Sequence, residues 1–154
     1  MLPFKKILSP TDFSELSYEA MKAANELALH FSAELYVVHV VPPIPTANVP
    51  APTSPSSLHI SSYRQELEES SKKSLDEIVK QQISKEVRAH PIVLEGDASY
   101  QIVRIAEEEN VDLIVIATHG ETGWRRLVLG SVAEKVGRLA PCAVLTIHAP
   151  HKEE

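Results

Sequence analysis

Short apolar runs alternate with amphipathic helical patterns along most of the chain, and this alternation restricts the fold more than any other feature. The runs that predict strands are "KKILSPTD", "AELYVVHVVP", "RAHPIVLEGD", "VDLIVIAT" and "CAVLTIH". The segments with apolar residues at helical spacing are 14–31, 63–85, 98–110 and 131–140. Parallel strands joined through helices need right-handed crossovers. The order β-α-β-α-β-α-β-α-β therefore predicts an α/β fold, a Rossmann-like five-stranded parallel sheet with helices on both faces.

Length, charge and composition restrict the class of protein. The 154 residues suffice for a single domain, 1–154, with a continuous core. The formal net charge of -6 argues against a nucleic-acid binder, because that role needs clustered Lys and Arg. We find no secretory signal and no apolar run that approaches a membrane span, so we expect a cytoplasmic protein without membrane contact. Cys142, the one cysteine, begins an apolar run and is expected to be a packed core residue.

Residues 42–62 hold six of the eleven prolines. Each proline removes a backbone donor, so this segment is not expected to form a central strand or a helix interior. We predict a mobile, Pro-rich surface loop at about 42–62. Loops of this length are unusual in a compact domain, and the sequence leaves open whether the loop has a function or is only tolerated.

Residues 117–135, "ATHGETGWRRLVLGSVAEK", contain three of the five glycines and follow the most apolar strand. Gly130 and Ser131 open the last predicted helix, whose unpaired first amides and positive dipole end suit a phosphate. The alternative is structural, with Ser131 as the helix cap and the glycines in turns. No Lys follows Gly130, so the stretch is not a Walker loop.

In sheets of this kind a ligand binds outside the carboxyl ends of the strands, where the strand order reverses. The ends of the first and fourth strands, "SPTD" and "ATHG", are therefore expected to lie side by side. Asp12 has two interpretations. With Glu15 three residues on, it is an N-cap of the next helix, a role for which Ser14 is also available, or its carboxylate accepts hydrogen bonds from a ligand. The two roles can coexist in different rotamers.

Other side chains near the glycines do not predict an enzyme. His119 lies beside the predicted phosphate site, but no orienting carboxylate is evident, so a role in loop structure is favoured. His39, inside an apolar strand, is typical of a satisfied core residue, and Arg125 and Arg126 are typical of a solvated face. Trp124 covers the pocket or packs against a partner. We predict no catalytic residue and no metal site, since no His, Asp and Glu cluster has ligand spacing.

Three stretches resemble the universal stress protein family. They are "ILSPTDFSELSYEAMKAANELA", "YVVHVV" and "DLIVIATHGETGWRRLVLGSVAEKVGRLAPCAVLTI", which follow the family's order and cover nearly the whole chain. Nucleotide-binding members carry G-x2-G-x9-G-[S/T], and here the pattern is Ala117, then Gly120, nine residues and Gly130-Ser131. The resemblance implies the universal stress protein fold, with an adenine nucleotide at the strand ends. ATP is the expected ligand, and ADP and AMP are the alternatives.

The resemblance also implies a set of nucleotide-binding residues. Pro10, Thr11 and Asp12 would lie at the adenosine end, and the backbone of Val40 would meet the adenine. The residues implied for the ribose and the phosphates are Ala117, Gly120, Gly130, Ser131 and Val132. Any Mg²⁺ would be bound through the phosphates.

Two positions depart from the family pattern. Ala117 replaces the first glycine, and its methyl group crowds a close backbone approach. Ala133 stands where a hydroxyl residue can add a phosphate contact, so that hydrogen bond is missing. A neutral hydrogen bond is worth about 0.5–1.5 kcal/mol, or about tenfold in affinity, so its loss weakens binding without abolishing it.

The resemblance implies a dimeric, ATP-binding regulatory protein of the stress response, with an unknown protein partner and at most slow ATP hydrolysis. The homodimer would form through the C-terminal strand "CAVLTIH", because an exposed apolar edge strand needs a partner. The alternative is a family member that acts as a dimeric interaction module without nucleotide. An adenylating enzyme is disfavoured, since Pro10 and Thr11 replace the two glycines of the S-G-G-x-D-S loop in ATP pyrophosphatases.

Overall fold

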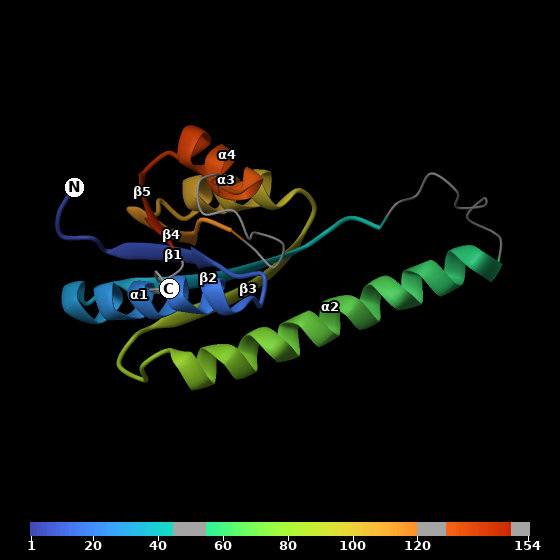
Figure 1. The fold of residues 1–154 in the computed structure, drawn as a ribbon. Helices are drawn as coiled ribbons and strands as arrows, with labels where there is room; N and C mark the ends of the chain where they lie inside the picture. The colour runs from blue at the N-terminus through green and yellow to red at the C-terminus, as the bar shows by residue number, and fades with distance from the viewer. Residues whose placement is uncertain (45–54, 120–128, 149–154) are drawn as a thin grey trace, which may run out of the picture.

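The computed structural model describes residues 1–44, 55–119 and 129–148, and Figure 1 shows its fold. Five strands form one parallel sheet in the order β3-β2-β1-β4-β5. The strands are β1 (Lys6–Pro10), β2 (Glu34–Val41), β3 (Ala89–Glu95), β4 (Leu113–Ala117) and β5 (Ala143–Ile147). The predicted five-stranded parallel sheet is confirmed.

The helices cover both faces of this sheet, as predicted. They are α1 (Glu15–Phe31), α2 (Pro55–Gln82), α3 (Ala98–Glu108) and α4 (Ser131–Leu139). Helices α1 and α2 lie on one face, and α3 and α4 lie on the other (Figure 1). Within the described ranges, no helix is both long enough and apolar enough to cross a membrane.

The sheet separates two apolar cores. Successive side chains of a strand point to opposite faces. Ile7 therefore packs toward α1 and α2, in the first core, and Leu8 packs toward α3 and α4, in the second core. Both side chains are fully buried. Burial on both faces explains why the central strands are apolar throughout instead of alternating. Cys142 packs against the second core, and its partial burial raises the pKa of the thiol.

Helix α2 begins earlier than the sequence predicts. We expected a loop over 42–62, but residues 55–62 are helical and α2 starts at Pro55. A proline is well tolerated at the first helical position, because its missing N–H would have no partner there in any case. The proline-based prediction was therefore wrong for this part. Residues 45–54 lie outside the described residues, and the loop there stays a prediction.

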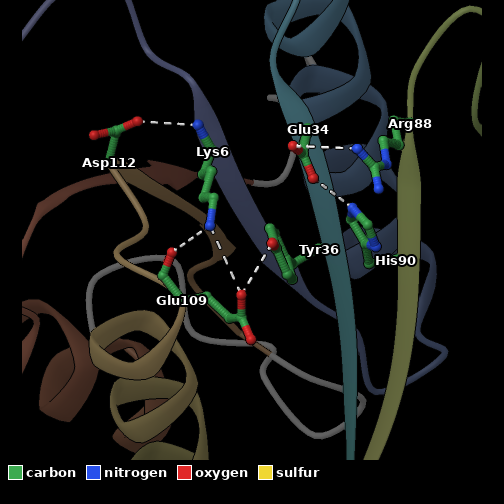
Figure 2. A network of polar contacts seen from close by, with 7 residues as sticks. All are labelled: Lys6, Glu34, Tyr36, Arg88, His90, Glu109 and Asp112. Carbon is green, nitrogen blue, oxygen red and sulfur yellow. Dashed lines mark hydrogen bonds and ion pairs between the residues drawn. The ribbon is translucent and has the colours of Figure 1, made fainter.

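A polar network joins the strands at the amino edge of the sheet, where the parallel strands begin (Figure 2). Asp112, just before β4, accepts hydrogen bonds at Oδ2 from the backbone N–H groups of Lys5 (2.7 Å) and Lys6 (2.9 Å). The ammonium group of Lys6 donates to the carbonyl oxygen of Glu109 at 2.8 Å, and the Tyr36 hydroxyl donates to the Glu109 carboxylate at 3.1 Å. The network joins β1, β2, the end of α3 and the start of β4.

The same edge carries a second group of contacts, between β2 and β3 (Figure 2). Glu34 lies 2.6 Å from Nε2 of His90 and 3.7 Å from Nη1 of Arg88. The His90 ring in turn stacks on Tyr36, with 4.7 Å between ring centroids. The hydrogen bond with His90 is the main cause that lowers the pKa of Glu34. Polar groups at the amino edge thus satisfy one another.

We expect Asp112→Ala to lower the free energy of unfolding by about 1.5–3 kcal/mol, since hydrogen bonds to a charged acceptor are worth this much. The variant leaves the amides of Lys5 and Lys6 without their acceptor. Asp112→Asn is the matched control, because it keeps an acceptor oxygen and should lose less stability. Urea denaturation measures both, and equal losses in the two variants would contradict the role of this acceptor.

Candidate functional site

A cavity of about 420 Å³ opens at the carboxyl ends of the strands, between β1 and β4. Strand order reverses at this point, because β1 pairs with both β2 and β4. The expectation that the ends of the first and fourth strands lie side by side is confirmed. The structure brings eight of the residues predicted to bind nucleotide to this cavity: Pro10, Thr11, Asp12, Val40, Ala117, Gly130, Ser131 and Val132. The ninth, Gly120, lies outside the described residues.

The turn between β1 and α1 forms one wall of the cavity and is held by a chain of hydroxyl groups. The N–H of Phe13 donates to Oγ1 of Thr11 at 3.1 Å, and that oxygen lies 2.8 Å from Oγ of Ser17. The Ser17 hydroxyl donates to the carbonyl oxygen of Ser14 at 2.8 Å, so the Thr11 hydroxyl must donate to Ser17. Thr11 is buried and its hydroxyl is committed within the protein. Its side chain therefore shapes the turn.

Asp12 does not cap α1, which corrects one of its two interpretations. The N-cap is Ser14, whose hydroxyl accepts a hydrogen bond from the N–H of Ser17 at 3.2 Å. Asp12 accepts from the N–H of Ser14 at 3.0 Å, which closes an Asx turn just before the helix. Asp12 is exposed and lines the cavity. The partial burial of Tyr18 raises the pKa of its hydroxyl group, and the nearby charge of Asp12 raises it further.

Helix α4 points its amino end at the cavity without a side-chain cap. Its N-cap residue is Gly130, so Ser131 is the first helical residue, and the interpretation of Ser131 as the cap was wrong. The first intrahelical bond runs from the N–H of Glu134 to the carbonyl of Gly130 at 2.9 Å. The amides of Ser131, Val132 and Ala133 precede that bond and are the donors that a helix leaves unpaired. All three residues line the cavity.

Gly130 is needed at this position because two backbones meet there. Its N–H donates to the carbonyl oxygen of Thr118 at 2.6 Å. A Cβ added to Gly130 would lie 2.6 Å from the same oxygen, closer than a Cβ carbon approaches a nonbonded atom. The φ angle of Gly130 is -59°, so close contact is the reason for glycine here, and a left-handed backbone is not. The contact fixes the start of α4 against the end of β4.

The remaining walls of the cavity are mainly apolar. They are contributed by Val38 and Val40 of β2, Ala98 and Ile102 of α3, and Ile116 of β4. Among the described lining residues, only Asp12 and His119 have ionisable side chains. The cavity therefore combines an apolar wall, one carboxylate and a set of backbone donors, which suits a ligand with an apolar part and an anionic part.

The two histidines that the sequence singled out have different surroundings. His119 lines the cavity, its Nδ1 lies 3.1 Å from the Thr118 hydroxyl, and its Nε2 is buried without a hydrogen-bond partner among the described residues. His39 is partly buried, and its Nδ1 lies 2.8 Å from the carbonyl oxygen of Thr11. His39 is thus satisfied, as its apolar strand predicted. The described residues hold no cluster of His, Cys, Asp and Glu that would bind a metal ion.

The sequence model of the universal stress protein family matches residues 3–148. The chain belongs to the universal stress protein family. It is 39% identical over 150 residues to universal stress protein MJ0531 of Methanocaldococcus jannaschii, and the matched region covers 97% of this chain and 85% of that relative. It is 32% identical to universal stress protein YxiE of Bacillus subtilis, over 94% of this chain and 99% of that relative.

Solved structures of this universal stress protein's relatives agree with its fold. The protein MJ0577 of Methanocaldococcus jannaschii superposes with a TM-score of 0.82 at 29% identity, covering 97% of this chain and 99% of the other. A family member from Burkholderia pseudomallei superposes with a TM-score of 0.67 at 30% identity, covering 95% and 97%. The similarity extends over whole chains, so the family assignment covers the sheet, its helices and the carboxyl edge.

Sequence reasoning missed part of the cavity of this universal stress protein. Val38 could have been found, because it lies two residues before Val40 on the same face of β2. Ala98 and Ile102 gave no local signal, since they are ordinary apolar positions of an amphipathic helix. Ser17 was also missed. It lines the cavity and shares a hydrogen bond with Thr11, and sequence spacing does not show that contact.

We expect Gly130→Ala to destabilise the protein by about 1–3 kcal/mol, the usual cost of forcing an extra methyl group into a packed site. The added Cβ would meet the carbonyl oxygen of Thr118. Gly137→Ala is the matched control in the same helix, because a Cβ there has no heavy atom within 4 Å. That control should gain up to about 1 kcal/mol from the higher helix propensity of alanine. Chemical denaturation gives both values, and a neutral Gly130→Ala would contradict the close contact.

Proposed function

We propose that this protein binds ATP at the carboxyl edge of its sheet and acts as a dimeric regulatory protein of the stress response in the cytoplasm. The observation that carries the proposal is the uncapped start of α4, whose first amides lie at the same cavity as Asp12 and an apolar wall. A helix start of this kind is a ready site for a phosphate group. ADP and AMP are alternative ligands with the same adenosine part.

The residues of the cavity divide between the two ends of the proposed nucleotide. Ser131 and Val132 would hold the phosphates through backbone N–H groups, and Ser131 would add its hydroxyl group. Gly130, whose own N–H is bonded to the Thr118 carbonyl, would hold the start of the helix beside the phosphates. Ala133, which lacks a hydroxyl group, would contribute its amide alone. Asp12 would accept hydrogen bonds from the ribose, with Ala117 beside it. Mg²⁺ bound through the phosphates would neutralise part of their charge.

The adenine would lie at the apolar end of the cavity. Val38 and Val40 of β2 form one side, and Ile102 of α3 forms another. The backbone of Val40 would provide the polar contacts that recognise the base. Universal stress proteins have been solved in complex with cAMP and, from Archaeoglobus fulgidus, with dAMP, so other members of this fold accommodate adenine nucleotides.

A regulatory role agrees better with the described site than an enzymatic one. A general base must reach a proton and be oriented for the task. Asp12 holds the Ser14 amide, and His119 contacts the Thr118 hydroxyl and no carboxylate among the described residues. We assign neither residue a catalytic role and propose slow ATP hydrolysis at most. A bound nucleotide would regulate by favouring one of two conformations that differ in affinity for an unknown protein partner.

We expect Asp12→Ala to weaken ATP binding about tenfold or more, because hydrogen bonds to a charged group are worth about 1.5–3 kcal/mol. Asp12→Asn separates the effect of the charge from the effect of the turn, since its side-chain oxygen still accepts from the Ser14 N–H while the charge is lost. Asp76→Ala removes an exposed carboxylate from α2 and is the control that should bind like the wild type. Isothermal titration calorimetry measures all four proteins. Unchanged affinity in a folded Asp12→Ala variant would remove Asp12 from the site.

The alternative function, a dimeric interaction module without nucleotide, is tested on the wild-type protein. Ala117 and Ala133, which depart from the nucleotide-binding pattern, are the residues that favour this alternative. Heat precipitation of the purified protein releases any bound nucleotide into the supernatant, where adenine absorbs light. An empty supernatant together with no binding of added ATP would favour the interaction module and overturn the nucleotide proposal.

The two outermost strands of the sheet, β3 and β5, differ in a way that supports a homodimer through β5. Edge strand β3 contains Pro91, which has no N–H to offer a further strand. Edge strand β5, "AVLTI", contains neither proline nor charge, and Leu145 is 40% exposed. A two-fold contact between copies of β5 would cover this apolar edge.

We expect the wild-type protein to have the mass of a dimer at micromolar concentration by light scattering, and Leu145→Lys to shift it to a monomer. A charged side chain on an edge strand opposes pairing. Leu29→Lys changes a side chain of similar exposure on α1, 39% against 40%, and should leave the dimer intact. A monomeric wild type, or a dimer that persists in Leu145→Lys, would exclude this interface.

A further inference from the structure

The turn that carries Asp12 is held from behind by His39 of the neighbouring strand. Val38 and Val40 face the cavity, and His39 between them points to the other face of the sheet. From there its Nδ1 lies 2.8 Å from the carbonyl oxygen of Thr11. Its ring packs against the ring of Phe13, with 4.2 Å between ring centroids and 35° between the ring planes. His39 therefore contacts residues on both sides of Asp12.

Phe13 adopts a backbone conformation that needs such support. Its φ angle is +65°, a left-handed conformation that is unfavourable for a bulky side chain with a Cβ. The conformation is retained because the Phe13 N–H bonds Oγ1 of Thr11 and its ring packs against His39 and the first core. The bend at Phe13 brings the Ser14 amide to the carboxylate of Asp12. Without His39, two of the contacts that hold this bend would be lost.

The same turn is anchored to β2 by its backbone. The N–H of Thr11 donates to the carbonyl oxygen of Val38 at 2.8 Å, and the carbonyl of Thr11 accepts from His39. The peptide groups before and after Thr11 are therefore both tied to the strand that forms the apolar wall of the cavity. A shift of His39 would change the distance between Asp12 and that wall.

We propose that His39 is a positioning residue of the nucleotide site, which holds the β1–α1 turn so that Asp12 faces the ligand. This inference rests on the proposed nucleotide function. It also requires one chemical state of the ring: a carbonyl oxygen only accepts, so Nδ1 must carry a proton. In the neutral form His39 is then the Nδ1–H tautomer, with Nε2 as the unprotonated nitrogen.

Nitrogen NMR of the wild-type protein tests the tautomer without any variant and without nucleotide. Long-range ¹H–¹⁵N correlations of the His39 ring distinguish a protonated Nδ1 from a protonated Nε2. We expect the Nδ1–H form. The Nε2–H form would overturn the proposal, because Nδ1 would then have no hydrogen to donate to Thr11.

Two variants test the positioning role. In His39→Asn the side-chain amide nitrogen is bonded to Cγ, as Nδ1 is, so the variant keeps a donor near the Thr11 carbonyl. His39→Leu replaces the ring by an apolar side chain of similar reach that has no donor. We expect His39→Leu to weaken ATP binding about tenfold, the usual effect of one hydrogen bond, and His39→Asn to stay within about threefold of wild type. Equal affinities of the Leu variant and the wild type would overturn the proposal.

His90→Leu is the matched control. His90 also makes a short hydrogen bond and an aromatic contact, but at the amino edge of the sheet (Figure 2). Its loss is expected to lower stability and to leave ATP affinity unchanged. A loss of ATP affinity in His90→Leu as large as in His39→Leu would show that both variants act through general destabilisation, and would overturn the specific role of His39.

Amide hydrogen exchange separates failure of this inference from failure of the proposed function. In His39→Leu we expect the amides of Phe13 and Ser14 to exchange about tenfold faster than in wild type, because their turn loses its anchor. His39→Asn should restore slow exchange. If the wild type binds no ATP, the nucleotide proposal fails while these rates still show whether His39 holds the turn. Unchanged rates in the Leu variant would overturn the anchor itself.

Discussion

The close contact between the end of β4 and the start of α4 determines what the carboxyl edge of the sheet can do. Thr118 accepts a hydrogen bond from the N–H of Gly130 and donates its own N–H to the carbonyl of Ile147 in β5. These two bonds join β5, β4 and α4 through one residue. A side chain larger than glycine at position 130 would separate the helix from the strand. The amides at the start of α4 would then shift relative to the cavity.

The two sides of the cavity are built by different physical means. On the α4 side the contacts are between backbones, so they depend on one glycine and tolerate many side chains elsewhere. On the β1–α1 side they depend on specific side chains, the hydroxyl groups of Thr11 and Ser17 and the ring of His39. The second side is therefore more sensitive to substitution. It also carries Asp12, the one acidic group among the described lining residues.

Local patterns predicted the elements of this fold but not the contacts between them. Periodicity was enough for the strands and helices, and the rule of strand-order reversal predicted that the ends of the first and fourth strands lie side by side. The errors came from residues with two favourable local roles. Pro55 fits a loop or a first helical turn, and Ser131 fits a cap or a first residue. Tertiary packing selects between such roles, and the packing of the His39 ring against Phe13 likewise has no sequence signal.

The amino and carboxyl edges of the sheet differ in two respects: how many polar groups have hydrogen-bond partners, and how strained the backbone is. This difference argues for a ligand site. At the amino edge, Asp112 and Glu34 are both paired with donors. At the carboxyl edge, α4 begins without a side-chain cap and Phe13 has a positive φ angle. Unpaired donors and strained backbone cost stability, and proteins retain them mainly where function requires them. Here glycine leaves the amides of α4 available to an anion, and the amino edge contributes the compensating stability.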